Sequence, residues 1–199
     1  VNSGYGVNEW SQADLMTELN TDYINSSPIS ETTKWYNGYS NSKNGTYDYS
    51  KNIKGGSIDK VANVRWNLGG ATYYASALNS YNQERGTSHV SNPSDGITRT
   101  NTWDGKIALM YPSDYGYAST GTACRSNLYK CNDADSKANN WLFNSAYQWT
   151  LSPISVSANG LFCVYSDGSL YIAVASSTYG VRPTLFLKSD VAISGGTGT

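Results

Sequence analysis

The spacing of hydrophobic positions changes from helical in the first half of the chain to strand-like in the second. Near the start, Trp10, Leu15 and Leu19 share one side of a helix. Ser11 stands where an N-cap is expected, and Trp10 and Leu15 occupy the two positions of a hydrophobic staple. The pattern therefore predicts a first helix that ends near Asn20.

Further helical patterns occur before residue 90. A short helix is predicted from Ser57, leading into residues 61–68, whose larger apolar side chains also fall at helical spacing. Residues 72–84 predict a second full helix, which Gly86 ends. The intervening stretch 21–56 is rich in Ser, Asn, Gly and Tyr without a sustained period, and it predicts a long loop.

From Trp103 onward the pattern is typical of short strands. Pro112 ends the first of them, and Pro183 places the last at a sheet edge or a bulge. The predicted strands are 106–111, 149–151, 161–166, 169–174 and 181–187. Two early helices, late strands and long irregular loops indicate an α+β domain with a mostly antiparallel sheet in its C-terminal half.

The dipeptide Asp167-Gly168 is the strongest hairpin signal in the chain. If these two residues form the turn, Ser166 pairs with Ser169, and the side chains beyond them alternate between two faces. One face is nearly all apolar and is expected to face the core: Leu161, Cys163, Tyr165, Leu170, Ile172 and Val174. The other face carries Phe162, Val164, Ser166, Ser169, Tyr171 and Ala173.

That second face has two interpretations: it packs under a long loop, or it is an exposed aromatic patch that binds a partner. The binding interpretation adds Asn159 and Tyr179 at the ends of the hairpin region. The predicted ligand-binding residues are therefore Phe162, Val164, Ser166, Ser169, Tyr171, Ala173, Asn159 and Tyr179.

Composition narrows the possible partners. Charged residues make up 15% of the 199 positions and the net charge is −1, which argues against a nucleic-acid or anionic-membrane surface. No apolar run approaches the ~20 residues that span a bilayer. The chain has 17 tyrosines and many serines and asparagines, which is typical of binding loops on a weakly charged surface.

The three cysteines do not indicate a metal site. Cys124 and Cys131 lie seven positions apart in a polar segment; either they close a disulfide loop, which suits an exported protein, or they are unrelated thiols. Cys163 is interpreted as a small buried hydrophobic residue. With His89 as the single histidine, the chain lacks the ligand spacing of a zinc site.

Catalytic groups are equally scarce. Asp95 and Asp104, each followed by Gly, are interpreted as turn residues, and Glu84 as a solvated residue in the last turn of its helix. Asp133 and Asp135 either ligate calcium or form a solvated acidic loop. We therefore expect no enzyme activity, no cofactor and no metal.

A series of motifs resembles a family of secreted type IV pilin-like proteins of gut Firmicutes and Mollicutes-like bacteria. The series spans essentially the whole chain, and its motifs are specific together rather than singly. They are WSQADLM (10–16), YNQERGT (81–87), WDGKIALMYPSDYGYA (103–118), NWL (140–142), WTLSP (149–153), YGVRP (179–183), LKSDV (187–191) and GGTGT (195–199).

The resemblance implies a single extracellular domain over residues 1–199 with a C-type-lectin-like, formylglycine-generating-enzyme-like fold. The family's N-terminal pilin-like helix, expected to be the membrane attachment, and the extreme C-terminus are expected to be missing from this sequence. Some relatives by fold are diversified by a retroelement that mutates adenines. Residues 152–182 hold none of the five residue types that such mutation of AAY codons cannot produce.

The resemblance therefore implies a cell-surface display or adhesin domain that binds a protein or glycan ligand on a host or neighbouring cell. One alternative is a filament subunit whose hairpin face contacts a second copy. Another is an enzyme of the formylglycine-generating type. The sequence departs from the family's relatives at the sites of chemistry: the calcium-binding tripeptides of true lectins and the catalytic cysteine pair of those enzymes have no match.

Overall fold

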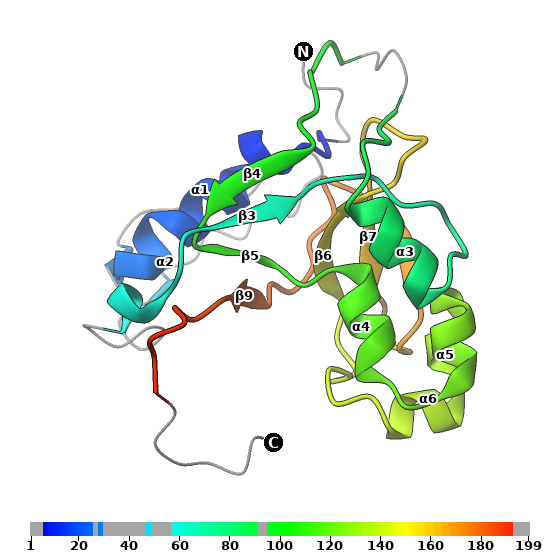
Figure 1. Ribbon diagram of the computed structural model, residues 1–199. Coiled ribbons are helices and arrows are strands. Elements are labelled where there is room, and N and C mark those ends of the chain that lie inside the picture. Colours follow the sequence, from blue (N-terminus) through cyan, green and yellow to red (C-terminus); the bar gives the residue numbers. More distant parts are fainter. Residues whose placement is uncertain (1–5, 26–27, 30–46, 49–56, 91–94, 193–199) are drawn as a thin grey trace.

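The computed structural model describes residues 6–25, 28–29, 47–48, 57–90 and 95–192 (Figure 1). Most of the loop predicted over 21–56 lies outside these residues. Within that stretch the structure has α2 Asp22–Asn25, β1 Pro28–Ile29 and β2 Tyr47–Asp48. Before it come a 3-10 turn Trp10–Gln12 and α1 Asp14–Asn20, and after it a 3-10 turn Ile58–Lys60.

The predicted first helix is present and ends at Asn20, but its start differs. Trp10–Gln12 forms a separate 3-10 turn, and α1 begins only at Asp14. The Glu9 carboxylate, rather than Ser11, accepts the hydrogen bond at the turn's start, from the Ser11 N–H. The start of the segment is thus fixed by a polar contact that the apolar spacing does not contain.

The remaining elements alternate strands with short helices. They are β3 Val64–Asn67, α3 Ala77–Glu84, β4 Thr102–Gly105, β5 Ile107–Leu109, α4 Pro112–Ala118, α5 Thr122–Ser126, a 3-10 helix η3 Leu128–Asn132, α6 Ala134–Ala138, β6 Gln148–Pro153, β7 Gly160–Val164, β8 Leu170–Val174 and β9 Pro183–Leu185. Every pairing between these named strands is antiparallel, so the chain is an α+β protein as the sequence predicts.

The helical interpretation of residues 61–68 is wrong, because this segment contains strand β3. It pairs with β4, and Trp66 is buried opposite Trp103, while Arg65 faces solvent opposite Asp104. Alternation of buried and exposed side chains is the signature of a strand. The second full helix is shorter than predicted: α3 starts after Ser76, whose hydroxyl accepts from the Asn79 N–H.

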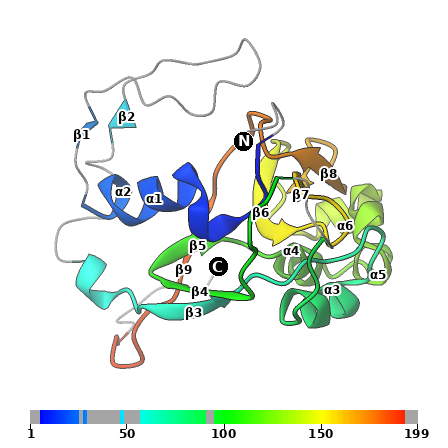
Figure 2. The same cartoon turned by 90° about the horizontal axis from the view of Figure 1, so that it is seen from above.

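The segment after Pro112 forms helices where the sequence analysis places only a strand end. Pro112 is the first residue of α4, and the Asp114 carboxylate accepts from the Tyr111 N–H as half of a capping box. α5, η3 and α6 follow within twenty residues and gather on one side of the molecule with α3 and α4 (Figure 2). The predicted disulfide between Cys124 and Cys131 joins α5 to η3.

The three-stranded sheet β6-β7-β8 lies between two hydrophobic cores. Phe162, Val164 and Leu170 pack on the helical side, against residues of α4, α5 and η3. Trp149 and Cys163 pack on the other side, against α1, β3 and β5. Both faces of this sheet therefore pack against a hydrophobic core.

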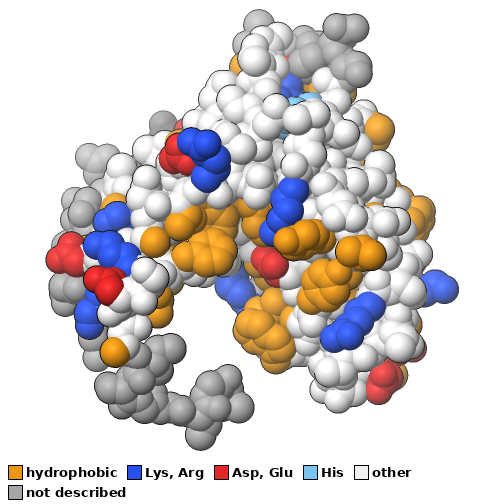
Figure 3. Space-filling view, in the orientation of Figure 1, with side chains coloured by type: hydrophobic (Ala, Val, Ile, Leu, Met, Phe, Trp, Pro, Cys, Tyr) orange, Lys and Arg blue, Asp and Glu red, His pale blue; other side chains and the backbone are white. Residues whose placement is uncertain are grey.

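The outer surface carries few charges. In Figure 3, hydrophobic side chains gather over α3 and α4 and over the region of β3 and β5, with charged side chains scattered around them. Within the described parts of the chain, no helix combines the length and the apolar character needed to cross a membrane.

Candidate functional site

The β7–β8 hairpin exists where it is predicted, but its register is shifted by one residue. Val164 pairs with Leu170, and Cys163 pairs with Tyr171, whereas the two-residue turn would pair Val164 with Tyr171. A shift by one residue places the side chains of one strand on the opposite face of the hairpin relative to the side chains of the other strand. The predicted division of the hairpin into a core face and a binding face is therefore wrong.

The cause lies in the turn. Tyr165 and Ser169 are hydrogen-bonded partners, so the loop has three residues, and Gly168 adopts a φ of 94°. A three-residue loop closed by a glycine with positive φ is a type I turn with a bulge. The Asp167 carboxylate fixes it by accepting from the N–H and hydroxyl of Ser169, at 2.9 and 2.7 Å.

Three of the predicted ligand-binding residues are buried, because both faces of the sheet pack against a core. Phe162, Val164 and Ser169 are each at most 2% exposed, two in the core and the third under the turn. They are not available to a ligand, because their contacts are already made inside the protein. The other predicted residues remain at least partly accessible: Asn159, Ser166, Tyr171, Ala173 and Tyr179.

Tyr171 and Tyr179 instead belong to a larger group that we call the tyrosine belt. Its rings contact one another in a continuous chain, although they come from six separate segments of the sequence. Four of them are between 36% and 55% exposed: Tyr74, Tyr129, Tyr147 and Tyr171. The belt consists of Tyr73, Tyr74, Tyr129, Tyr147, Tyr165, Tyr171 and Tyr179.

One end of the belt surrounds Tyr171 on the sheet's edge strand β8. Tyr73 meets Tyr171 edge to face with ring centroids 5.4 Å apart, and Tyr129 of η3 lies 5.7 Å from it. Tyr74 lies 5.3 Å from Tyr129 at an interplanar angle of 76°. The β3–α3 loop and η3 thus bring three tyrosines beside β8, on the side where Figure 2 shows α5 and α6.

The other end of the belt rests on the buried Trp149 of β6. Tyr179 lies 4.7 Å from Trp149 and stacks on Tyr147 at 5.1 Å. Tyr165 contacts Tyr147 at 5.1 Å and stacks on Tyr171 at the same distance, which joins the two ends. Aromatic pairs of this geometry stabilise one another by about 0.5–1.5 kcal/mol beyond their burial, so the rings are held in place without a ligand.

Backbone strain coincides with the belt. Two non-glycine residues of the described chain have a left-handed backbone: Tyr74, with φ of 63°, and Ser145, with φ of 59°. The first is a belt residue, and the second lies two positions before Tyr147 at the opposite end. Such conformations cost about 1–3 kcal/mol each and cluster where ligands are clamped.

The belt is electrically neutral. Burial, followed by the hydroxyls of Tyr74 and Tyr171, raises the pKa of Tyr73. Burial likewise raises the pKa of Tyr165, and the further causes are Tyr179, Cys163 and Tyr171. The phenols of Tyr73 and Tyr165 therefore stay protonated at neutral pH, and each keeps its hydrogen-bond donor.

Five belt residues are not among the site residues predicted from the sequence: Tyr73, Tyr74, Tyr129, Tyr147 and Tyr165. The sequence predicts Tyr73 and Tyr74 inside a helix and Tyr165 on the core face. The signal that could have found Tyr73 and Tyr74 is their place just before Ser76, a residue type that favours the N-cap and so puts both tyrosines ahead of the helix.

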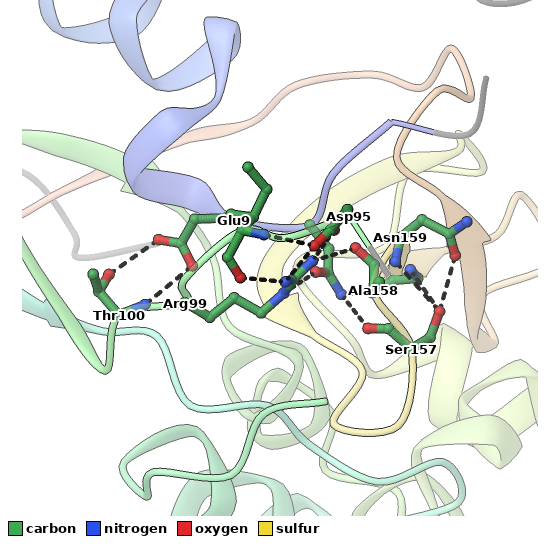
Figure 4. A network of polar contacts seen from close by, with 10 residues as sticks. Glu9, Asp95, Arg99, Thr100, Ser157, Ala158 and Asn159 are labelled. Atoms are coloured by element: carbon green, nitrogen blue, oxygen red, sulfur yellow. Dashed lines mark hydrogen bonds and ion pairs between the residues drawn. The ribbon is translucent and has the colours of Figure 1, made fainter. Parts of the chain in front are cut away.

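A separate polar network anchors the N-terminal segment, as Figure 4 shows. The Arg99 guanidinium forms an ion pair with Asp95 at 2.7 Å, and both side chains are at most 4% exposed. Arg99 also donates to the Asn8 side chain and to the Ala158 carbonyl, at 2.8 and 2.6 Å. Glu9 extends the network by accepting from the N–H and hydroxyl of Thr100. All donors of the arginine point into the protein, so the network is structural.

Asp95 and Glu84 both differ from their sequence interpretations. Asp95 is a buried ion-pair partner as well as a turn residue, since it also accepts from the Ile97 N–H. Glu84 is fully buried rather than solvated, and it accepts from the N–H and hydroxyl of Ser113 at 3.0 and 2.5 Å. Burial raises the pKa of Glu84 to about 7. Ser113 is itself fully buried, so this pair holds α3 to α4 and is closed to a substrate.

The three cysteines are likewise buried and inaccessible to a substrate. Cys124 and Cys131 are bonded to each other, and Cys163 is fully buried with a pKa raised to about 12 by burial. His89 and Arg99 line a shallow open depression. The Nε2 atom of His89 is hydrogen-bonded to the side chain of Asn101. Among the described residues, no three His, Cys, Asp or Glu side chains are grouped to hold a metal ion.

Comparison with known proteins adds no assignment to these observations. Neither protein-family models, nor curated proteins, nor solved structures gave a match to this chain.

Proposed function

We propose that this chain is a non-enzymatic binding domain that presents the tyrosine belt to a partner outside the cell. The observation that carries the proposal is the convergence of seven tyrosines from six segments on one accessible surface. Large exposed aromatic patches mark interaction sites on soluble domains, because leaving them in water is costly. The strained backbone at Tyr74 and Ser145 supports a site at both ends of the belt.

The uncharged side chains of the belt indicate the chemistry of its partner. Tyrosine supplies rigid apolar area and a hydroxyl at low cost in conformational entropy, which favours recognition of uncharged protein or glycan surfaces. Binding through the belt therefore depends little on ionic strength, because salt screens interactions between charges.

The proposal includes an extracellular location and a C-type-lectin-like fold, in a pilin-like or adhesin protein. The disulfide between Cys124 and Cys131 supports an oxidising compartment. The return of β9 to pair with β5, closing the chain beside an earlier strand, supports the fold. The variable surface implied by the family resemblance would then include Tyr165, Tyr171 and Tyr179, which lie within residues 152–182.

The test is a binding screen with two named probe sets, a random peptide library and an array of neutral glycans. We expect at least one probe to bind, and its affinity to fall about tenfold or more for Tyr171→Ser. Tyr117→Ser is the matched control, since Tyr117 is 45% exposed on α4 and is not a belt residue. Absence of binding to both sets, or equal affinity of the two variants, would overturn the proposal.

A further inference from the structure

Two tyrosines of the belt are in contact with each other and are both open to solvent. Tyr129 of η3 and Tyr171 of β8 are 38% and 36% exposed. Their ring centroids lie 5.7 Å apart, and the ring planes are tilted by 49°. A small dissolved molecule can therefore reach each ring, and each ring already touches the other.

The fold holds this pair together. The disulfide between α5 and η3 closes the short loop that contains Tyr129. The Asn132 amide of η3 donates to the Asp167 carboxylate at 3.4 Å, which ties η3 to the turn between β7 and β8. Tyr171 is fixed in β8 by its pairing with Cys163. The contact between the two rings is thus part of the folded structure and does not depend on a ligand.

Contacting phenols have a characteristic oxidation chemistry. A phenol that loses one electron and one proton becomes a phenoxyl radical, whose unpaired electron lies partly on the ring carbons next to the oxygen. Two such radicals join these carbons by a new C–C bond. Each joined carbon then releases its hydrogen as a proton and each oxygen takes one up, which restores both aromatic phenols. The pair loses two electrons and two protons in total; the electrons pass to two equivalents of a one-electron oxidant, and the protons pass to water.

The ring geometry of the belt favours one such pair. Two contacting pairs of the belt have both rings exposed: Tyr129 with Tyr171, and Tyr74 with Tyr129. The rings of Tyr74 and Tyr129 stand at 76°, so that the edge of one points at the plane of the other. A bond between ring carbons needs the two edges to meet, and the joined rings then adopt an intermediate twist. The tilt of 49° between Tyr129 and Tyr171 is closer to that arrangement.

We propose that Tyr129 and Tyr171 form a site of oxidative modification, at which a one-electron oxidant joins the two rings as dityrosine and so links η3 covalently to β8. The site is independent of any partner that the belt binds. Two groups held in contact react with a far higher effective concentration than two groups on separate molecules. Coupling within one chain is therefore favoured over coupling between chains in dilute solution.

The nearby thiol is engaged elsewhere. Cys163 is the free cysteine of the chain, and it is fully buried. Its sulfur lies 3.8 Å from the Tyr171 carbonyl and donates to it. A thiol quenches a phenoxyl radical by giving up its hydrogen, but this hydrogen is directed at the backbone and shielded from solvent. The neighbouring phenol is thus the available partner of an oxidised Tyr171.

Tyr117 of α4 provides a matched comparison. It is 45% exposed, so an oxidant reaches it at least as easily as it reaches Tyr129 or Tyr171. Within the described parts of the chain it has no ring contact. An oxidised Tyr117 is therefore expected to couple between molecules, with a yield that falls on dilution.

Limited photo-oxidation of the purified domain by a ruthenium complex with persulfate tests the proposal. After reduction of the disulfide, trypsin places Tyr129 in peptide 126–130 and Tyr171 in peptide 138–188, since Pro183 protects the bond after Arg182. We expect mass spectrometry to find these two peptides joined, two hydrogens below the sum of their masses, in protein that migrates as a monomer. The yield is expected to stay constant on dilution of the protein.

Phenylalanine variants identify the residues, because they keep each ring and its packing but remove the phenol. We expect the yield to fall about tenfold or more for Tyr129→Phe and for Tyr171→Phe. Tyr117→Phe and Tyr165→Phe are expected to leave it unchanged, the second because peptide 138–188 also contains Tyr165. Circular dichroism verifies the fold of each variant.

Three results would overturn the proposal. The first is the absence of the joined peptides under conditions that oxidise Tyr117. The second is a link from peptide 126–130 to peptide 66–85 in their place, which would assign the coupling to Tyr74 or its neighbour Tyr73. The third is a yield that falls on dilution or survives Tyr171→Phe, since the bond would then form between molecules or at another ring.

Discussion

Glu84 offers the most quantitative prediction of this structure. Its carboxylate sits at the end of α3, fully buried, and accepts two hydrogen bonds from Ser113 in the first turn of α4. Burial is the main cause that raises its pKa from 4.5 to about 7, and the charge of Asp114 adds to the rise. The Ser113 hydrogen bonds and the Arg85 guanidinium, with a nitrogen 3.6 Å from the carboxylate, lower the pKa and so oppose it. The ionised form of the Glu84 carboxyl group is therefore disfavoured in the folded chain relative to the unfolded chain.

The sign and size of the effect follow from proton linkage. Between pH 4.5 and about 7 the folded chain holds a proton on Glu84 that the unfolded chain has released, so the free energy of unfolding falls as the pH rises. A pKa difference of this size corresponds to roughly 3 kcal/mol across the window. The carboxylates of Asp95 and Asp167, whose pKa values are lowered from 3.8, contribute in the opposite direction and only at lower pH.

Urea unfolding at a series of pH values between 5 and 8 measures this dependence. Glu84→Gln keeps an acceptor for the Ser113 N–H and places an NH₂ donor against its hydroxyl, as a protonated Glu84 would. We expect the unaltered protein to lose stability over this range and the Gln variant to lose about 3 kcal/mol less. Asp59→Asn, which removes an exposed carboxylate outside this contact, is the control and is expected to keep the slope. A Gln variant with the slope of the unaltered protein would refute a buried, proton-binding Glu84.

Three further measurements follow from the other contacts. Asp95→Asn leaves the buried Arg99 charge uncompensated and is expected to cost about 3 kcal/mol in urea unfolding; a loss under 1 kcal/mol would contradict the burial of the pair. Replacing Cys124 and Cys131 together by Ala removes a short closed loop and is expected to cost about 2 kcal/mol, measured without reductant; a stability unchanged from that of the unaltered protein would contradict the disulfide's contribution. Tyr74→Gly relieves about 1 kcal/mol of left-handed strain but loses the ring contacts with Tyr73 and Tyr129 and frees the unfolded chain, so it is expected to cost about 1–2 kcal/mol in thermal unfolding; a gain in stability would contradict the stabilising contribution of those contacts.

The sequence predicted the late strands and the disulfide because their signals are local. The strands over 149–151 and 161–166 are short apolar runs between polar loops, and the two cysteines lie seven positions apart in one polar segment. The buried state of Glu84 was beyond such reasoning. Its partner Ser113 stands 29 positions away on another helix, and a carboxylate in the last turn of a helix is usually solvated.

The helices after Pro112 were missed for a different reason. A proline that follows an apolar run ends a strand, but it also suits the first position of a helix, where its missing N–H is not needed. Asp114, two positions later, is the residue that resolves the choice, since its carboxylate accepts from the Tyr111 N–H. Reading the proline together with that aspartate would have predicted α4.

The register of the β7–β8 hairpin shows where a pattern argument fails in principle. Alternation fixes register when one face of a strand is apolar and the other polar, because a slip would then bury the polar set. Here Phe162 and Val164 enter one core and Cys163 enters the other, so both registers bury apolar side chains and the pattern does not distinguish them. The choice falls to the turn, where Gly168 with its positive φ and the Asp167 carboxylate select three residues over two. That same one-residue choice places Tyr171 beside Cys163 and within reach of Tyr165, and so the turn, rather than the hydrophobic pattern, joins the two ends of the tyrosine belt.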